Sequence, residues 1–169
     1  MLQKIDPNTI HVDPFTLIGD QWALLTAGDK DGYNTMTVSW AGLGVLWHEP
    51  VATVYVRPQR YTYQFTEKSD YFTLTFFAPG EQRKALNLCG SKSGRDMDKF
   101  AEAGITAAFA QCGAPYVAEG ELVLVCKKLY AQDMSEEAFL DPSLVGEYYS
   151  AKDFHRMYVG QIIEAYRRV

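Results

Sequence analysis

The chain has 169 residues, of which 47% are hydrophobic and 22% charged, and this composition is typical of a folded globular protein and excludes a disordered one. The 16 Lys and Arg residues and 21 Asp and Glu residues give a net charge of −5, which argues against a nucleic-acid-binding protein because such proteins present a basic face. The length suits one domain, and we expect residues 1–169 to form a single domain.

Cysteine usage and hydropathy predict the compartment. The three cysteines, Cys89, Cys112 and Cys126, are an odd number without close pairing, which predicts free thiols and a reducing compartment. The N-terminal segment lacks the apolar core of a signal peptide, and no run of about 18 apolar residues occurs. No Cys/His cluster has the spacing of metal ligands. We therefore expect a cytoplasmic protein that binds no metal, no membrane and no nucleic acid.

Short strands dominate the elements predicted in the first half of the chain. Residues 22–27 are apolar and lead into a Gly- and Asp-containing turn at residues 28–32, which is typical of a hairpin. Residues 34–40 alternate in polarity, as a half-buried strand does, and the glycines that follow are expected to interrupt that strand. Four further strands are predicted, at residues 51–57, 71–77, 122–130 and 158–166.

Helical signals are fewer and shorter. A helix over residues 59–68 would begin after a proline, and helices over residues 81–89 and 97–103 would end at Gly90 and Gly104. Because strands outnumber helices and connect through short turns, the sequence predicts a mainly β fold, an antiparallel barrel with helices at its ends. The strand–helix alternation of a doubly wound parallel sheet is missing, and so is the GxGxxG fingerprint.

The turn from Val56 to Thr62 is the first candidate for a binding site. A predicted strand ends and a helix begins there, so backbone N–H groups without helical partners should point out of the turn. Arg57, Arg60 and the Thr62 hydroxyl lie in the same turn. Together these groups describe a phosphate site. The alternative is two solvated arginines at the end of a strand.

The loop at residues 89–96 is the second candidate. It contains two glycines, two serines, Lys92 and Arg95. Small residues let backbone amides form an anion-binding concavity, and the two cations can supply positive charge. The alternative is an ordinary polar loop in which Ser93 caps the next helix.

The strand over residues 34–40 is the third candidate. Its polar groups at Asn34, Thr37 and Ser39 could bond the rim of a heterocycle, and Trp40 could form a wall beside the ring. On pattern alone, a half-buried strand with its polar face in solvent is the better explanation.

No hydrolytic site is apparent. The histidines His11, His48 and His155 are far apart in the sequence, and no serine lies in a nucleophile elbow. His48, Glu49 and Pro50 are expected to form a turn, and Cys89 is expected to be an inert, partly buried thiol.

Four segments, in this order along the chain, resemble the flavin reductase-like family of FMN-binding split barrels, which includes flavoredoxin. They are Asn34-x-Met36-Thr37-Val38-Ser39-Trp40, Arg57-Pro-Gln-Arg60-Tyr61-Thr62, Ser93-Gly-Arg95-Asp96-x-Asp98-Lys99-Phe100 and His155-Arg-Met-Tyr158-Val-Gly160. One such segment would be weak evidence, whereas four in register, spread from about residue 22 to residue 166, are strong.

The resemblance implies a six-stranded antiparallel Greek-key split barrel that forms a homodimer and binds FMN near the subunit interface. It assigns the isoalloxazine ring to Asn34, Met36, Thr37, Val38, Ser39 and Trp40. It assigns the ribityl phosphate to Arg57, Arg60, Tyr61, Thr62, Ser91 and Lys92. His155 would lie near the flavin or the incoming nicotinamide, and the resemblance assigns no other catalytic residue.

The implied reaction is hydride transfer from NADH or NADPH to the flavin, with electrons then passed to an acceptor. One alternative is a non-catalytic FMN-binding protein that stores flavin or senses redox state, and another is a split barrel that binds haem. Gln161 departs from the acidic residue common in relatives, and the turn at residues 48–50 departs from their double proline. The acidic and aromatic segment at residues 133–150 is a candidate to cover the flavin.

Overall fold

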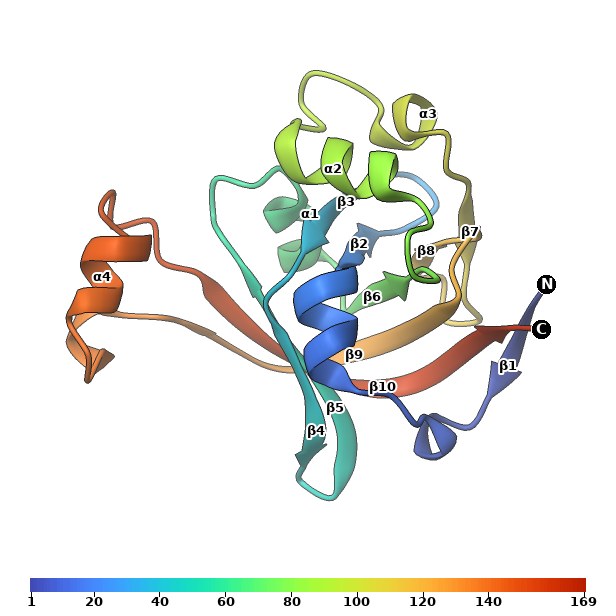
Figure 1. The fold of residues 1–169 in the computed structure, drawn as a ribbon, viewed down its shortest axis with the longest axis horizontal. Helices are drawn as coiled ribbons and strands as arrows, with labels where there is room; N and C mark the ends of the chain where they lie inside the picture. The colour runs from blue at the N-terminus through green and yellow to red at the C-terminus, as the bar shows by residue number, and fades with distance from the viewer.

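A computed structural model of the chain describes all 169 residues and shows a strongly bent antiparallel sheet with short helices at its periphery (Figure 1). The strands are β1 (Leu2–Ile5), β2 (Ala23–Gly28), β3 (Tyr33–Val38), β4 (Ala41–Leu46), β5 (Glu49–Val56), β6 (Tyr71–Phe76), β7 (Ala107–Phe109), β8 (Pro115–Val117), β9 (Leu122–Asp133) and β10 (Arg156–Arg168). The α-helices are α1 (Thr62–Lys68), α2 (Arg83–Ser91), α3 (Lys99–Ala103) and α4 (Ser143–Tyr148). Two 3-10 turns, at Pro7–Thr9 and Glu136–Ala138, and a π-helix at Thr16–Gln21 complete the set.

The main sheet has eight strands, in the order β3-β2-β6-β9-β10-β5-β4 with β1 paired to β10. Every pairing is antiparallel, and β7 and β8 form a separate two-stranded sheet. The predicted mainly β antiparallel fold with flanking helices is therefore confirmed. The sheet has more strands than the six expected, since β1 pairs with the far end of β10 and β4 pairs with β5.

The two ends of the sheet are consecutive in the chain. β3 and β4 stand at opposite ends of the strand order, and only Ser39 and Trp40 lie between them. Each of these strands has one paired edge and one free edge. The barrel is therefore split at this point, and the free edge of β3 faces the gap.

The sequence predicted that the glycines after Trp40 interrupt a strand. In the structure they lie inside β4 instead. A side chain at Gly42 would meet only Thr53 Cβ, at 4.0 Å, and one at Gly44 would meet nothing within 4 Å. The break falls two residues earlier, at Ser39 and Trp40, because β3 and β4 pair with different strands.

The β4–β5 hairpin projects from the body of the molecule (Figure 1). Its turn is formed by Trp47 and His48, which have φ of 55° and 63°, the left-handed values that a tight two-residue hairpin turn requires. The turn predicted at residues 48–50 is thus displaced, since Glu49 and Pro50 belong to β5. Val45, Leu46 and Trp47 are exposed at the tip.

α1, α2 and α3 begin and end close to the predicted positions, with one informative exception, whereas α4 was not predicted. α2 continues through Gly90 to Ser91, so this glycine does not end the helix. A Cβ at Gly90 would lie 3.3 Å from Thr37 Cβ, so the glycine lets α2 approach β3 closely. α3 does end at a glycine, Gly104, with φ of 64°, and it is capped by Asp98 rather than by Ser93.

The core fills the inside of the sheet and the space beneath α2 and α3. Leu25, Phe72 and Leu124 are fully buried between the strands, and Leu86 packs under the helices. Cys89 is fully rather than partly buried, in the second cluster, where burial raises the pKa of its thiol to about 11 and so disfavours the reactive thiolate. None of the helices is long and apolar enough to span a lipid bilayer.

Candidate functional site

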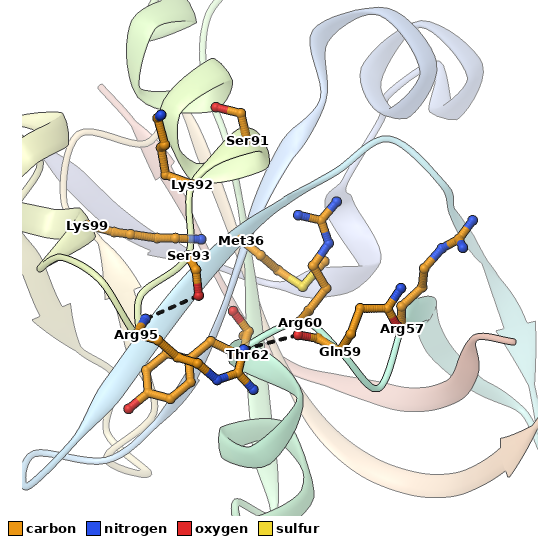
Figure 2. Close-up of a pocket in the computed structure, with 11 residues that line it drawn as sticks. Met36, Arg57, Gln59, Arg60, Thr62, Ser91, Lys92, Ser93, Arg95 and Lys99 are labelled. Carbon is orange, nitrogen blue, oxygen red and sulfur yellow. Dashed lines mark hydrogen bonds between the residues drawn. The ribbon is translucent and has the colours of Figure 1, made fainter. Parts of the chain in front are cut away.

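Two cavities adjoin each other beside the split in the sheet, and they share Met36, Arg57 and Arg60. The larger, which we name the cationic cavity, has a volume of about 460 Å³. It is lined by Met36, Arg57, Gln59, Arg60, Tyr61, Thr62, Ser91, Lys92, Ser93, Arg95 and Lys99 (Figure 2). The smaller, the aromatic cavity, has a volume of about 210 Å³ and is lined by Met36, Thr37, Val38, Ser39, Trp40, Tyr55, Arg57, Arg60 and His155.

The structure brings every predicted site residue to these two cavities except Asn34. This residue is buried beneath them, and its Nδ2 donates a hydrogen bond of 2.8 Å to Thr62 Oγ1. Asn34 therefore joins β3 to the first residue of α1. The strand, the turn and the loop that the sequence singled out separately form one continuous site.

The charge of the cationic cavity is uncompensated except at Arg57, which pairs with Asp153. Five cationic side chains line it, and no carboxylate does, although the chain as a whole carries a net charge of −5. Arg60 Nη1 donates to the Gly90 carbonyl at 2.8 Å, and Arg95 Nη1 donates to the Gln59 carbonyl at 3.1 Å. Neutral oxygens orient these guanidinium groups without cancelling their charge. Such a concentration of positive charge in a concave surface attracts an anion.

Lys99 is a site residue for which the sequence analysis assigned no role. Its side chain is buried, with only 4% of the residue exposed, and Nζ donates to the Thr35 carbonyl at 3.0 Å and to the Cys89 carbonyl at 2.8 Å. The ammonium thus bridges β3 and the last turn of α2 at the floor of the cavity. Burial lowers the pKa of Lys99. The sequence signal was the N-cap Asp98, which makes Lys99 the first residue of α3.

Arg57 differs from Arg60, although the sequence treated the two as equivalent. Its Nη1 lies 2.5 Å from Asp153 Oδ2, and its Nη2 donates to the Tyr148 carbonyl at 2.9 Å. Its guanidinium carbon lies 5.1 Å from the centre of the Tyr149 ring. Arg57 therefore holds the segment before β10 against the site, and Asp153 compensates its charge.

His155 lines the aromatic cavity as a neutral group. Its Nδ1 lies 2.7 Å from the Tyr149 hydroxyl, and its ring centre lies 5.4 Å from that of Trp40. Burial, with a smaller contribution from the neighbouring Arg57 that Asp153 opposes, lowers the pKa of His155 to about 4. The imidazole is uncharged at neutral pH, so it offers a hydrogen bond and a flat surface rather than a positive charge.

The segment at residues 133–150 covers the cavities only at its end. α4 is set apart from the body of the molecule (Figure 1), and Leu140 is fully exposed. The Tyr148 ring packs edge-on against Trp40, a residue that lines the aromatic cavity, with 5.4 Å between the centroids. Most of the segment therefore lies away from the site.

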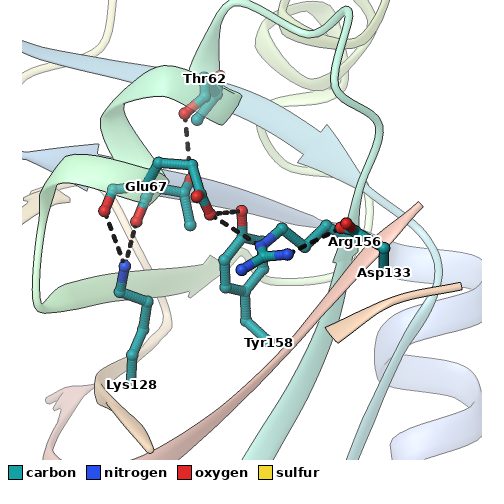
Figure 3. Close-up of polar contacts among 7 residues, drawn as sticks. Thr62, Glu67, Lys128, Asp133, Arg156 and Tyr158 are labelled. Carbon is teal, nitrogen blue, oxygen red and sulfur yellow. Dashed lines mark hydrogen bonds and ion pairs between the residues drawn. The ribbon is translucent and has the colours of Figure 1, made fainter. Parts of the chain in front are cut away.

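A second charged cluster holds α1 in place at its opposite end (Figure 3). Tyr158 donates its hydroxyl to Glu67 Oε1 at 2.5 Å, and Arg156 Nε donates to the same oxygen at 3.0 Å. Arg156 Nη1 also bonds Asp133, at 2.8 Å. Lys128 Nζ donates to the Glu67 carbonyl at 3.2 Å. We name these residues the Glu67 cluster. It ties α1 to β9 and β10 and so fixes where Thr62 meets the cationic cavity.

The donor set fits a ligand that combines a flat heteroaromatic ring with an anionic tail. The aromatic cavity offers the free edge of β3, where backbone groups have no partner strand, together with Trp40 and His155. The cationic cavity offers guanidinium, ammonium and hydroxyl groups that bond phosphate oxygens. Tyr55 and Gln59 also line the site, and no local sequence signal identified them.

Comparison with known proteins identifies relatives across most of the chain. Residues 16–168 match the family model described as "Flavin reductase like domain". The chain is 28% identical over 99 residues to a high molecular weight rubredoxin of Moorella thermoacetica, a match that covers 59% of this chain and 42% of that protein. It therefore spans less than half the length of this curated relative.

Two solved structures are similar in fold. The flavoredoxin of Methanosarcina acetivorans aligns with a TM-score of 0.67 and 23% identity, over 88% of this chain and 68% of that one. An FMN-binding domain of a flavin reductases-like enzyme from Shewanella baltica aligns with a TM-score of 0.69 and 19% identity, over 99% and 77% of the two chains. At these identities the two likenesses establish the fold.

Proposed function

Because the chain belongs to the flavin reductase-like domain family, with residues 16–168 matching its model, we propose that it binds FMN and passes hydride or electrons through it. The family match confirms the resemblance that the four sequence segments indicated. The observation that carries the proposal is the pair of adjoining cavities, one lined by cations without carboxylates and the other bordered by the free edge of β3.

The cationic cavity would hold the ribityl phosphate. Arg60 and Lys92 would contact it from the rim, and Lys99 from the floor, where its ammonium is already positioned by two carbonyl groups. The Thr62 hydroxyl, whose oxygen accepts from Asn34, supplies a further donor, and the Ser91 hydroxyl, which donates to the Asn87 carbonyl at 2.8 Å, would rotate to bond the phosphate. Hydrogen bonds to a charged phosphate oxygen are about twice as strong as neutral ones.

The aromatic cavity would hold the isoalloxazine ring. Backbone groups from Met36 to Trp40 would bond its polar edge, because β3 has no partner strand on that side. Trp40 and His155 would bound the space next to the ring. Arg57, through its contacts with Asp153 and Tyr148, would keep His155 in this position.

The bound cofactor supplies the redox chemistry, which is acceptance of a hydride from NADH or NADPH and release of electrons to an acceptor. The chain's own contribution is placement and electrostatics. The cations of the rim would stabilise negative charge on the cofactor, and the neutral His155 keeps its contact with the Tyr149 hydroxyl and adds no positive charge at neutral pH. An open face beside Trp40, which is 46% exposed, would admit the nicotinamide.

As part of the same proposal, the protein is a cytoplasmic homodimer. The tip of the β4–β5 hairpin exposes Val45 and Trp47 at 78% and 55%, and such apolar exposure is typical of a protein–protein contact. Light scattering of the purified protein would test the dimer, and a monomer that still binds FMN would contradict this assignment.

The decisive experiment is a visible spectrum followed by anaerobic addition of NADH or NADPH. We expect the protein to bind FMN, to show its blue absorbance, and to lose that absorbance with either nicotinamide. Protein that holds FMN but stays oxidised with both donors would support a storage or redox-sensing role instead. A Soret band, or no flavin binding at all, would overturn the proposal.

A further inference from the structure

The side chain of His155 makes one hydrogen bond within the chain, with the Tyr149 hydroxyl, whose oxygen lies 2.7 Å from Nδ1. We infer that Tyr149 is a positioning residue. Its hydroxyl donates to Nδ1, which keeps the imidazole proton on Nε2 and makes His155 a hydrogen-bond donor to a carbonyl oxygen in the aromatic cavity. The inference rests on the proposed function, because the flavin ring and the nicotinamide are the two sources of such a carbonyl.

The proton of the Tyr149 hydroxyl has two acceptors within reach. The thioether sulfur of Met134 lies 3.7 Å from the hydroxyl oxygen, and Nδ1 of His155 lies 2.7 Å from it. A thioether is a weak acceptor, whereas the unprotonated nitrogen of a neutral imidazole accepts well. The hydroxyl therefore donates to Nδ1. Because a neutral imidazole carries one proton, that proton is then on Nε2.

The surroundings of His155 keep the imidazole neutral, as this arrangement requires. The residue is 8% exposed, and Arg57 and Arg60 both disfavour a further positive charge. Asp153 opposes them, but its carboxylate is paired with Arg57. Burial and the two guanidinium groups lower the pKa of His155 to about 4, so at pH 7 the ring has a defined tautomer.

Nε2 of His155 is open to the aromatic cavity. It makes no hydrogen bond within the chain, and every buried side-chain nitrogen or oxygen has a partner, so Nε2 itself is accessible. The residue is otherwise buried, and the open space that it lines is the aromatic cavity. The centre of its ring lies 5.4 Å from that of Trp40. A ligand that lies along Trp40 therefore meets the proton on Nε2.

The Tyr149 ring is held on several sides, which gives its hydroxyl a fixed place. The ring stacks on Phe154 with 4.9 Å between the centroids, and it packs against Phe139 at 5.6 Å. The guanidinium carbon of Arg57 lies 5.1 Å from its centre. These contacts involve the ring, so Tyr149→Phe should remove the hydrogen bond and keep the packing. Tyr149 lines neither cavity and acts on a ligand only through His155.

The position of the proton decides what His155 offers to a ligand. With the proton on Nε2, the imidazole donates to a carbonyl oxygen. With the proton on Nδ1, Nε2 would be an acceptor, and its lone pair would repel the same oxygen. The Tyr149 hydroxyl thus makes the cavity favour a carbonyl group without adding charge to it.

The first test is nitrogen-15 NMR of the histidine side chains at pH 7. The chain has three histidines, and the signals lost in His155→Gln identify those of His155. We expect a protonated Nε2 and an unprotonated Nδ1 in wild type, and a second population protonated at Nδ1 in Tyr149→Phe. Tyr130→Phe is the matched control and should change nothing, because Tyr130 is exposed, bonds Gln132 and lines neither cavity. The wild-type spectrum decides the tautomer even if Tyr149→Phe fails to fold.

The second test measures two dissociation constants, that of FMN by titration and that of NADH or NADPH from anaerobic single-turnover reduction of the FMN-loaded protein. In Tyr149→Phe we expect one of them to rise about twofold to tenfold, the range for one neutral hydrogen bond, while the other changes less than about twofold. A rise for FMN places the carbonyl on the flavin. A rise for the nicotinamide places it on the carboxamide.

A double substitution separates positioning from packing. His155→Gln keeps an N–H donor in its amide, and this donor depends on no tautomer. Adding Tyr149→Phe to His155→Gln should therefore change neither constant, although the same change in wild type raises one of them. An equal rise in both backgrounds would show that Tyr149 only packs the site, and would overturn the inference.

The outcomes separate this inference from the proposed function. A wild-type spectrum with the proton on Nδ1, or a Tyr149→Phe variant in which neither dissociation constant changes, would overturn the inference and leave FMN binding in place. Protein that binds no flavin would overturn the proposed function and the donor role of His155 with it, whatever the tautomer.

Discussion

The two ends of helix α1 carry charged clusters that differ in how their charges are compensated. At Thr62 the helix borders the cationic cavity, where Arg60 and Lys99 bond only to carbonyl oxygens and no carboxylate lines the space. At the other end, Glu67 accepts hydrogen bonds from Tyr158 and Arg156. One seven-residue helix thus separates a group of unpaired cations from a network of matched charges.

The comparison distinguishes charge that stabilises the fold from charge that awaits a ligand. In a network of paired charges each partner contributes to the stability of the fold, and removing one member leaves the others without a hydrogen-bond partner. Cations gathered without acids repel one another, so removing one of them should cost the fold little. Mutations at the two ends of α1 should therefore separate stability from binding.

The largest effect is expected from Glu67→Ala at the compensated end. The change leaves Arg156 Nε and the buried Tyr158 hydroxyl without their acceptor, although Arg156 Nη1 keeps its bond to Asp133, and we expect the free energy of unfolding to fall by about 2–3 kcal/mol. Urea unfolding measures this, with Glu102→Ala, at an exposed position on α3, as the control. If Glu67→Ala leaves the free energy of unfolding unchanged and abolishes FMN binding instead, the division between a stabilising end and a binding end of α1 is wrong.

Arg60→Ala tests the uncompensated end. We expect FMN binding to weaken by about 1.5–3 kcal/mol, the range for a lost charged hydrogen bond, while the free energy of unfolding changes by less than about 0.5 kcal/mol. Riboflavin, which has no phosphate, should bind equally to wild type and variant. Arg167→Ala, at the far end of β10, is the control. An equal loss of FMN and riboflavin would place Arg60 outside the phosphate site.

His155 tests whether burial and the neighbouring Arg57 and Arg60 make the stability of the protein depend on pH. Its pKa in the folded state is about 4 and its ordinary value is 6.5, so the unfolded chain binds more protons between these values and stability falls as the pH is lowered. Between pH 7 and pH 5 this single group should cost about 2 kcal/mol.

Urea unfolding of wild type and His155→Gln at both pH values checks this expectation. The substitution should remove the difference, whereas His11→Gln, at an exposed position, should retain it. A His155→Gln variant with the wild-type pH dependence would show that another group is responsible.

The smallest effect is expected at Arg57, the one cation of the site with an acidic partner. Arg57→Ala and Asp153→Asn should each lower the free energy of unfolding only slightly, and the double variant should lose no more than Arg57→Ala alone, because both substitutions break the same ion pair. An Arg57→Ala variant that keeps its stability but binds FMN as weakly as Arg60→Ala would place Arg57 among the unpaired cations.

Most of the fold was predictable because its strands carry local signals. Alternating or β-branched segments bounded by turn residues identified β2, β3, β5, β6, β9 and β10. The short strands β1, β7 and β8 have three or four residues each and depend on distant partners, as in the pairing of Leu2 with Arg168. Gly90 looked like a helix end because the close approach of α2 to β3 is not encoded locally.

The site was predictable in outline but not in the roles of its residues. The residue types in the turn and the loop identified an anion site, since cations, hydroxyls and glycines lie close together in the sequence. The difference between Arg57 and Arg60 depends on Asp153, which lies 96 residues away from Arg57 in the chain. The role of Lys99 depends on carbonyl groups of β3 and α2, and no sequence pattern marks such acceptors.

The gap between β3 and β4 has a dynamic consequence. With only Ser39 and Trp40 joining the two ends of the sheet, no ladder of hydrogen bonds closes the barrel there. A molecule bound against the free edge of β3 would connect the two sides of this gap through non-covalent contacts. Amide hydrogens of residues 36–40 should then exchange with deuterated water more slowly once a ligand is bound there. Those of β6 and β9, in the middle of the sheet, should keep their exchange rates.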